Sequence, residues 1–278
     1  MLKAISNHWP EYLMEAWGLG TFMVAACLGT AILWNPGSPV QHWLSESPYI
    51  QRLLMGTAMG LTAIAIVYSP WGKRSGAHIN PALTLTFLRL GKIHPWDAFF
   101  YVIFQFIGAI VGVALTWFLL GNYLAVPQVN FAVTVPSEAG TWIAFMAEFL
   151  ISAGIMATVL IVSNSGRLAN LTGIFIGCLL VLYIVFEAPY SGMSMNPART
   201  VGSAVVANVW TGMWLYFAAP TLGMLLAAEI YLWTKGKDAV HCAKLHHTSD
   251  VRCIFKCGYK DMMNSEMKTE DSKTIQLK

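Results

Sequence analysis

The sequence predicts an all-α membrane protein with six transmembrane helices and two re-entrant half-helices, arranged as two inverted repeats. First, 56% of the 278 residues are hydrophobic and only 11% are charged, whereas a soluble domain carries about 25% charged residues. Second, six apolar runs are long enough to cross a bilayer. Third, a ten-residue motif occurs twice, once in each half of the chain. Because each half holds three spans, an odd number, the two halves must insert in opposite directions.

The six apolar runs cover residues 13–33, 50–69, 96–119, 140–163, 171–186 and 209–234. The fifth run is short, so we expect it to tilt or to extend past Glu187. The N-terminus has no clear cleavage pattern for a signal peptide, so we expect the first run to remain as a span. The runs define a membrane domain over residues 1–235, with repeats at about 10–125 and 139–235, followed by a tail over 236–278.

Small residues recur at four-residue spacing within four of the runs. This spacing lets membrane helices approach closely and predicts a tightly packed bundle. The pairs are Gly56/Gly60, Gly108/Gly112, Gly173/Gly177 and Ala219/Gly223.

Basic residues are concentrated in the connections on one side of the predicted bundle. The connection over residues 70–92 carries four basic residues and no acid, and the tail begins with Lys235 and Lys237. The connections over 34–49 and 120–138 have no Lys or Arg. The positive-inside rule therefore predicts a plasma or inner membrane protein with both termini in the cytoplasm. The formal net charge of +3 is too small to suggest nucleic-acid binding.

The repeated motif predicts the start of a helix in each half. Its copies read S-G-A-H-I-N-P-A-L-T from Ser75 and S-G-M-S-M-N-P-A-R-T from Ser191. Asn is a favoured N-cap, and Pro is favoured at the first helical position because no N–H is needed there. The following helices, Pro81 to about Leu90 and Pro197 to about Ala207, are too short to cross a membrane. The two triplets are Asn80-Pro81-Ala82 and Asn196-Pro197-Ala198.

Two such half-helices, one from each face, predict a pore for neutral polar molecules. Unpaired helix ends cannot face lipid, so the loops must be covered by protein or line a water-filled path. Their positive dipole ends would meet near the midplane and repel cations and protons. The amides of Asn80 and Asn196 would donate hydrogen bonds to a solute, and the carbonyls of residues 76–79 and 192–195 would accept them.

Arg199 follows the second triplet, where Leu83 stands in the first. An Arg within a membrane indicates a functional site. We expect it on the outer side of the midplane, where it would add charge repulsion and fixed donors. The alternative is an Arg that reaches the interface or pairs with a Glu.

At these residues the chain resembles the major intrinsic protein family, the aquaporins and glycerol facilitators, over about residues 10–235. The resemblance implies a homotetramer in membrane lipid, one pore in each protomer, and charge exclusion by the paired half-helices. It further implies that Glu15 and Glu148 are buried braces for the re-entrant loops. The alternative is that they are surface carboxylates at the membrane interface.

The resemblance also implies a selectivity constriction formed by Arg199 and three other side chains. Counting from the second motif gives Met193 and Ile184. Counting from the first motif gives Gly60. It gives Met59 if the S-P-W-G-K-R segment before that motif holds one extra residue. Orthodox water channels carry an aromatic residue and a His in this constriction. A constriction lined by Met and Ile would admit a solute that is larger or less polar than water. The alternative for the aliphatic residues is ordinary core packing.

Other positions resemble the water-selective branch. Thr200 stands where glycerol facilitators usually carry Asp, and Ala204 and the Tyr216-Phe217 pair are similar to water channels. We therefore favour passive conduction of water without a cofactor, with a glycerol or other small-solute facilitator as the rival. An ion-coupled secondary transporter is disfavoured because its acids should lie near the midplane. The spans contain no pair of a nucleophile and a base, the pattern that would indicate an enzyme.

His78 and the tail carry the remaining polar candidates. We expect His78 to face the pore or brace its loop, the alternative being a surface His. In the tail, Cys242, Cys253 and Cys257 lie near three histidines, His241, His246 and His247. Their C-x10-C-x3-C spacing fits no zinc-finger pattern, so we expect no metal site and a reduced or membrane-apposed tail, with the three Cys as weak metal candidates. From Asp261 on, the polar composition predicts disorder.

Overall fold

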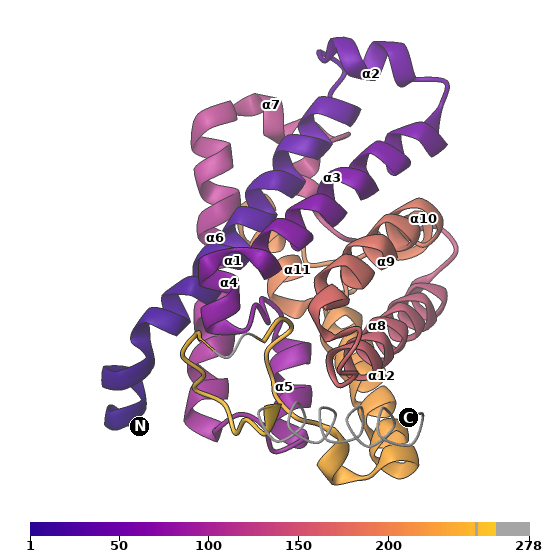
Figure 1. Cartoon of the computed structure of the whole chain (residues 1–278). Coiled ribbons are helices and arrows are strands. Elements are labelled where there is room, and N and C mark those ends of the chain that lie inside the picture. Colours follow the sequence, from indigo (N-terminus) through magenta and orange to yellow (C-terminus); the bar gives the residue numbers. More distant parts are fainter. Residues whose placement is uncertain (248–249, 260–278) are drawn as a thin grey trace, which may run out of the picture.

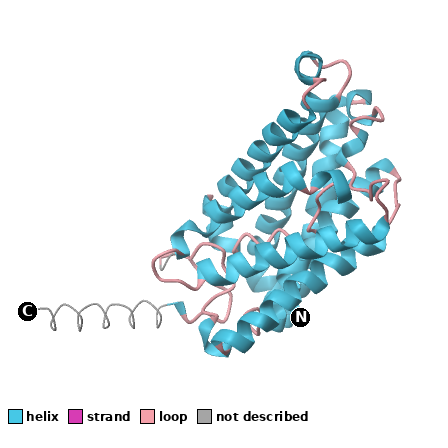
Figure 2. Cartoon of the chain, turned by 90° about the vertical axis from the view of Figure 1, so that its right-hand side faces the viewer, coloured by secondary structure: helices cyan, strands magenta, loops and turns pink. Residues whose placement is uncertain are grey.

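The computed structural model describes residues 1–247 and 250–259, and this part of the chain is a helical bundle without strands (Figures 1 and 2). In this part of the chain, six helical segments are long and apolar enough to cross a membrane, which confirms the predicted number of spans. Five of them are α1 (Leu2–Trp34), α3 (Pro48–Tyr68), α6 (Pro95–Leu120), α8 (Thr141–Ser163) and α12 (Met213–Lys235). The other, Ala169–Phe186, consists of α9 (Thr172–Phe186) and the short helical turn before it.

The two short helices after the repeated motif are α5 (Pro81–Arg89) and α11 (Pro197–Ala207). The Asn80 side chain accepts a hydrogen bond from the Ala82 N–H at 2.9 Å. The Asn196 side chain accepts from the N–H groups of Ala198 at 3.0 Å and Arg199 at 3.2 Å. Both Asn residues are therefore N-caps, as the sequence predicts.

One predicted span boundary is wrong. Helix α1 begins at Leu2 instead of near residue 13, and Glu11 in its added turns pairs with Arg74 at 2.9 Å. This ion pair supports a polar helical extension that a hydropathy pattern cannot detect. Helix α9 ends at Phe186, the predicted end of the fifth run, so of the two expectations for this short run the extension past Glu187 is wrong. The short α10 (Ala188–Ser191) follows and leads into the second motif.

The spans pack in pairs, α1 on α6, α3 on α9 and α8 on α12. Glycines allow the backbones to touch: a Cβ on Gly108 would lie 2.1 Å from the Ala16 carbonyl oxygen. A Cβ on Gly60 would lie 2.6 Å from the Gly177 carbonyl oxygen, and one on Gly223 would lie 2.3 Å from that of Phe149. Close helix approach at the small residues is thus confirmed.

The remaining elements are short and lie at the two ends of the bundle. Figure 1 shows α2 (Pro39–Leu44) and α7 (Asn122–Ala125) at one end, and the N-terminus together with the segment after α12 at the other. The elements not yet placed are α4 (Pro70–Ser75), η1 (Asn130–Ala132), η2 (Ala169–Leu171) and η3 (Lys237–Ala239). After η3 the described tail folds back against the bundle, and the predicted disorder after Asp261 lies outside the described residues.

Candidate functional site

The two motifs meet head to head inside the bundle. The Asn80 side-chain amide donates to the Met195 carbonyl at 2.7 Å, and the Asn196 amide donates to the Ile79 carbonyl at 2.7 Å. Each amide therefore bonds the carbonyl that directly precedes the other Asn. Because an amide nitrogen carries two hydrogens, one N–H of each Asn is left for a further acceptor.

Two buried carboxylates hold the loops in matching ways. Glu15 accepts hydrogen bonds from the Ser75 hydroxyl at 2.7 Å and from the N–H groups of His78 and Ile79 at 3.0 and 2.6 Å. Neither Glu15 nor Glu148 is exposed, which contradicts the alternative of surface carboxylates.

Glu148 makes the equivalent set of bonds in the second half. It accepts from the Ser191 hydroxyl at 2.6 Å and from the N–H groups of Ser194 and Met195 at 2.6 and 2.7 Å. The two halves thus reproduce the same hydrogen-bond pattern around opposite loops, as an inverted repeat requires.

The braced loops contain strained backbone. Four residues other than glycine have positive φ angles, Ala77, Ile79, Met193 and Met195. Each such residue costs about 1–3 kcal/mol unless its surroundings hold it. The Tyr101 hydroxyl donates to the Ser75 carbonyl at 2.6 Å, and the Tyr216 hydroxyl makes the same bond to Ser191. These bonds and the two carboxylates fix the loops in this conformation.

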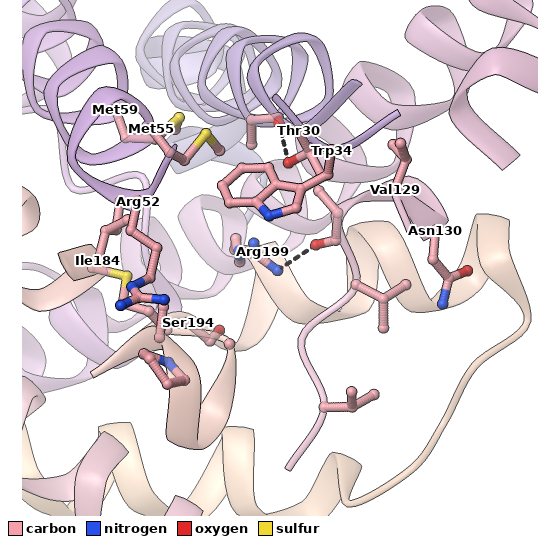
Figure 3. Close-up of a pocket in the computed structure, with 18 of the residues that line it drawn as sticks. Thr30, Trp34, Arg52, Met55, Met59, Val129, Asn130, Ile184, Ser194 and Arg199 are labelled. Carbon is pink, nitrogen blue, oxygen red and sulfur yellow. Dashed lines mark hydrogen bonds between the residues drawn. The ribbon is translucent and has the colours of Figure 1, made fainter. Parts of the chain in front are cut away.

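Cavities lie on both sides of the Asn pair. The first, of about 490 Å³, is lined by Met193 and by Met59, Ile184 and Arg199 among others (Figure 3), and we name it the outer cavity after the orientation predicted from the sequence. The second, of about 90 Å³, is lined by both Asn residues, along with His78 and the carbonyl-bearing segments, and we name it the inner cavity. Phe22, Leu180 and Ser194 line both cavities. The arrangement provides space for small molecules on either side of the junction.

Met59 and Gly60 have different surroundings. Met59 lines the outer cavity, whereas Gly60 lies against the Gly177 backbone of α9. Of these two positions, Met59 is therefore the one that faces the candidate path.

Arg199 is held by neutral groups. Its Nη1 donates to the Ala132 carbonyl at 2.8 Å, a bond drawn as a dashed line in Figure 3, and its side chain lines the outer cavity. A backbone carbonyl carries no full charge, so this partner does not neutralise the guanidinium.

His78 is buried and links the first loop to the tail. Its Nδ1 lies 3.1 Å from the Thr84 hydroxyl, and its Nε2 lies 2.7 Å from the Ala243 carbonyl. The ring is stacked between Phe87 and Phe255. A surface position is therefore wrong, and the contacts match a side chain that braces the loop.

Sequence reasoning missed several participants. Gln105 donates to Glu15 at 2.9 Å and to Thr84 at 3.1 Å. It follows Tyr101 by four residues, and the matching position after Tyr216 is Pro220, so the repeat gave no signal for it. The tail contributes Leu245 to the inner cavity. It also gathers Cys242, Cys253 and Cys257 with His247, although the Cys spacing predicted no metal site.

A known protein family has the same sequence pattern. The family model for the major intrinsic protein matches residues 2–231. The chain belongs to the major intrinsic protein family. The six candidate spans in the described part of the chain agree with a multi-pass membrane protein.

The relatives of this family member include plant aquaporins. It is 35% identical to "Aquaporin NIP2-3" of Zea mays over 201 residues, which are 72% of this chain and 64% of that protein. It is 34% identical to "Aquaporin NIP6-1" of Arabidopsis thaliana over 212 residues, 76% of this chain and 68% of that protein. The match thus spans slightly less than two thirds of the maize relative.

A solved structure supports the fold of this family member. The aquaglyceroporin from Plasmodium falciparum superposes with a TM-score of 0.67, covering 81% of this chain and 96% of that chain. The sequences are 18% identical, so this likeness concerns the fold alone.

Proposed function

We propose that this protein conducts water through a pore in each protomer while excluding protons and ions. The observation that carries the proposal is the reciprocal pair of bonds in which Asn80 donates to the Met195 carbonyl and Asn196 donates to the Ile79 carbonyl, with a cavity on each side. The pair places two amide donors and two helix N-termini at one point. A water oxygen can accept a hydrogen bond there, while the converging dipoles disfavour a cation.

Arg199 supplies the second barrier to charge. It lies at the outer cavity with a neutral carbonyl partner, so its positive charge acts on anything that enters. Together with Met59, Ile184 and Met193, it forms the selectivity constriction of the proposed pore. The loop carbonyls between the constriction and the Asn pair supply the acceptors.

A glycerol or other small-solute facilitator is the second candidate. The three aliphatic side chains at the outer cavity favour it because they offer apolar surface and no competing donors to a carbon-bearing solute. Thr200 favours water, since it bonds Thr134 at 2.8 Å within a buried hydroxyl network and does not widen the path. Ion-coupled transport is disfavoured because Glu15 and Glu148 already accept loop hydrogen bonds.

Stopped-flow light scattering on proteoliposomes tests the proposal. With sucrose as osmolyte, we expect faster shrinkage than in empty vesicles, and with glycerol, little re-swelling. Rapid re-swelling in glycerol would select the facilitator instead. Shrinkage equal to empty vesicles in both assays would overturn both candidates.

We extend the proposal to assembly and orientation. A homotetramer in a plasma or inner membrane, with both termini in the cytoplasm, fits the apolar side chains exposed on the spans, such as Leu61, Phe118 and Leu150. Native mass spectrometry of the detergent-solubilised protein tests the tetramer. Accessibility of a C-terminal tag in right-side-out vesicles tests the orientation.

A further inference from the structure

The tail covers the inner end of the candidate pore. Leu245 lines the inner cavity, is 4% exposed, and donates its backbone N–H to the Gly76 carbonyl at 3.1 Å. The Ala243 carbonyl bonds His78, and the Phe255 ring stacks on the same imidazole. An apolar side chain from the tail thus forms part of the wall of the inner cavity, through which water would have to pass.

The tail is attached to elements from both repeats. The Lys256 N–H donates to the Lys92 carbonyl at 2.9 Å, and the His241 N–H donates to the Asn164 side chain at 2.7 Å. Arg252 donates to the Asn7 carbonyl at 3.0 Å. The described residues 241–247 and 250–258 therefore extend across the inner face of the bundle, where the orange and yellow ribbon lies below α4 and beside α5 (Figure 1).

This segment has no helix or strand among its described residues 241–247 and 250–258. Small folded units with little hydrophobic core are commonly stabilised by a disulfide or a structural metal ion. The three tail cysteines are free. The Cys242 and Cys253 sulfurs lie 3.6 Å apart, far beyond the roughly 2.05 Å of a disulfide bond.

A metal-ligand set is gathered at this place. The Sγ atoms of Cys242, Cys253 and Cys257 and a ring nitrogen of His247 all lie within 4.8 Å of one another. The Cys257 sulfur is 3.0 Å from His247 Nε2. Zinc–sulfur bonds of about 2.3 Å in a tetrahedron place two sulfurs about 3.8 Å apart, and a sulfur and a nitrogen about 3.5 Å apart. The Cys242–Cys253 separation of 3.6 Å and the Cys257–His247 separation of 3.0 Å lie slightly below these values.

We propose that Cys242, His247, Cys253 and Cys257 bind one thiophilic divalent metal ion, Zn²⁺ being the best fit, and that the bound ion holds Leu245 in the inner mouth. Three thiolates and one imidazole form a closed Cys₃His set, which is typical of structural zinc sites. The second half of the proposal rests on the proposed channel function, whereas the first does not.

The surroundings favour thiolates. The Lys244 ammonium, which donates to the Arg252 carbonyl at 2.7 Å, lies near enough to stabilise the anionic sulfurs. Three thiolates and one Zn²⁺ have a formal net charge of −1, which the Lys244 ammonium would offset.

Metal content tests the site. The full chain, purified without a polyhistidine tag, is saturated with ZnCl₂, dialysed, and analysed by inductively coupled plasma mass spectrometry. We expect one zinc per protomer in the wild type and in Cys178→Ser, a matched control whose exposed thiol lies in α9. Cys253→Ser and Cys257→Ser should lose the zinc.

Cobalt loading gives a reading that needs no variant. Co²⁺ bound by the wild-type chain should show the intense visible bands of a tetrahedral thiolate complex, which added Zn²⁺ removes. A wild type that retains no zinc, or Cys variants that retain as much zinc as Cys178→Ser, would overturn the site.

Permeability tests the closing role. Wild-type proteoliposomes are compared after zinc loading and after removal of zinc with a membrane-permeant chelator, next to Leu245→Ala. We expect several-fold higher permeability after zinc removal and in Leu245→Ala, with no response to zinc in Cys253→Ser. Equal permeability with and without zinc would overturn the closing role. If no preparation conducts, including Leu245→Ala, the proposed function fails while the zinc stoichiometry still decides the site.

Discussion

Asn80 and Asn196 each donate a hydrogen bond to the carbonyl that directly precedes the other, and both bonds measure 2.7 Å. The two re-entrant loops are therefore joined at their tips and not merely adjacent. Because each loop is also held by its own carboxylate, the junction depends on two equivalent supports. Loss of either support should disturb both loops.

Asn80→Ser and Asn196→Ser should destabilise the protein equally. Ser remains a good N-cap for α5 or α11 but lacks the amide donor, so each variant removes one bridging bond and keeps the helix start. We expect a loss of about 1 kcal/mol for each variant. The midpoint of thermal unfolding in detergent measures it, with Asn122→Ser, at an exposed position, as the control. Strongly unequal losses would contradict a reciprocal junction.

Glu15→Ala and Glu148→Ala should be far more damaging. Glu15→Ala leaves the donors of Ser75, His78 and Ile79 without an acceptor, and each buried unpaired donor costs about 1–3 kcal/mol. Summed over a loop, this approaches the total stability of a domain, about 5–15 kcal/mol. Size-exclusion chromatography after a heating series measures the surviving fraction.

Glu229→Ala is the matched control for both carboxylates, since Glu229 pairs with Arg89 at a half-exposed site. An exposed pair contributes about 0–1 kcal/mol, so this variant should melt close to the wild type. If Glu15→Ala melts where Glu229→Ala does, the carboxylate is not a brace.

The sequence predicts the spans and half-helices because their signals are local. An Asn-Pro pair caps and starts a helix wherever it stands, and an apolar run is visible in composition. The start of α1 was wrong because its polar first turns are held by a distant residue, Arg74, which pairs with Glu11. No window of the sequence around residue 11 contains that partner.

Two further features could not be predicted for a related reason. They are the choice between Met59 and Gly60 and the cluster of Cys and His in the tail. Helix α4 occupies the connection between α3 and the first motif, so counting residues alone could not choose between Met59 and Gly60. His247 lies beside the cysteines in a tail that folds back onto Gly76, His78 and Lys92. Contacts between remote segments decide both outcomes.

Arg199→Val should raise the proton leak. Val removes the guanidinium from the outer cavity, and loss of about 1.4 kcal/mol of electrostatic barrier raises a rate about tenfold. A pH-sensitive dye trapped in proteoliposomes, with the membrane potential clamped by valinomycin, measures the leak. Arg199→Lys retains the positive charge and should stay near the wild type. An unchanged leak in Arg199→Val would remove Arg199 from the barrier to charge.

Met59→Ala and Gly60→Ala should act in different ways although the residues are neighbours. Met59 lines the outer cavity, so its truncation widens the constriction and should raise glycerol permeability relative to water. A Cβ on Gly60 would lie 2.6 Å from the Gly177 carbonyl oxygen, so Gly60→Ala should force α3 from α9 and cost about 1–3 kcal/mol. Its unfolding midpoint should fall while the permeability ratio of the folded fraction stays the same. Leu61→Ala, at a 60% exposed position, is the control for both measurements. An unchanged glycerol-to-water ratio in Met59→Ala would show that the narrowest point lies elsewhere along the path.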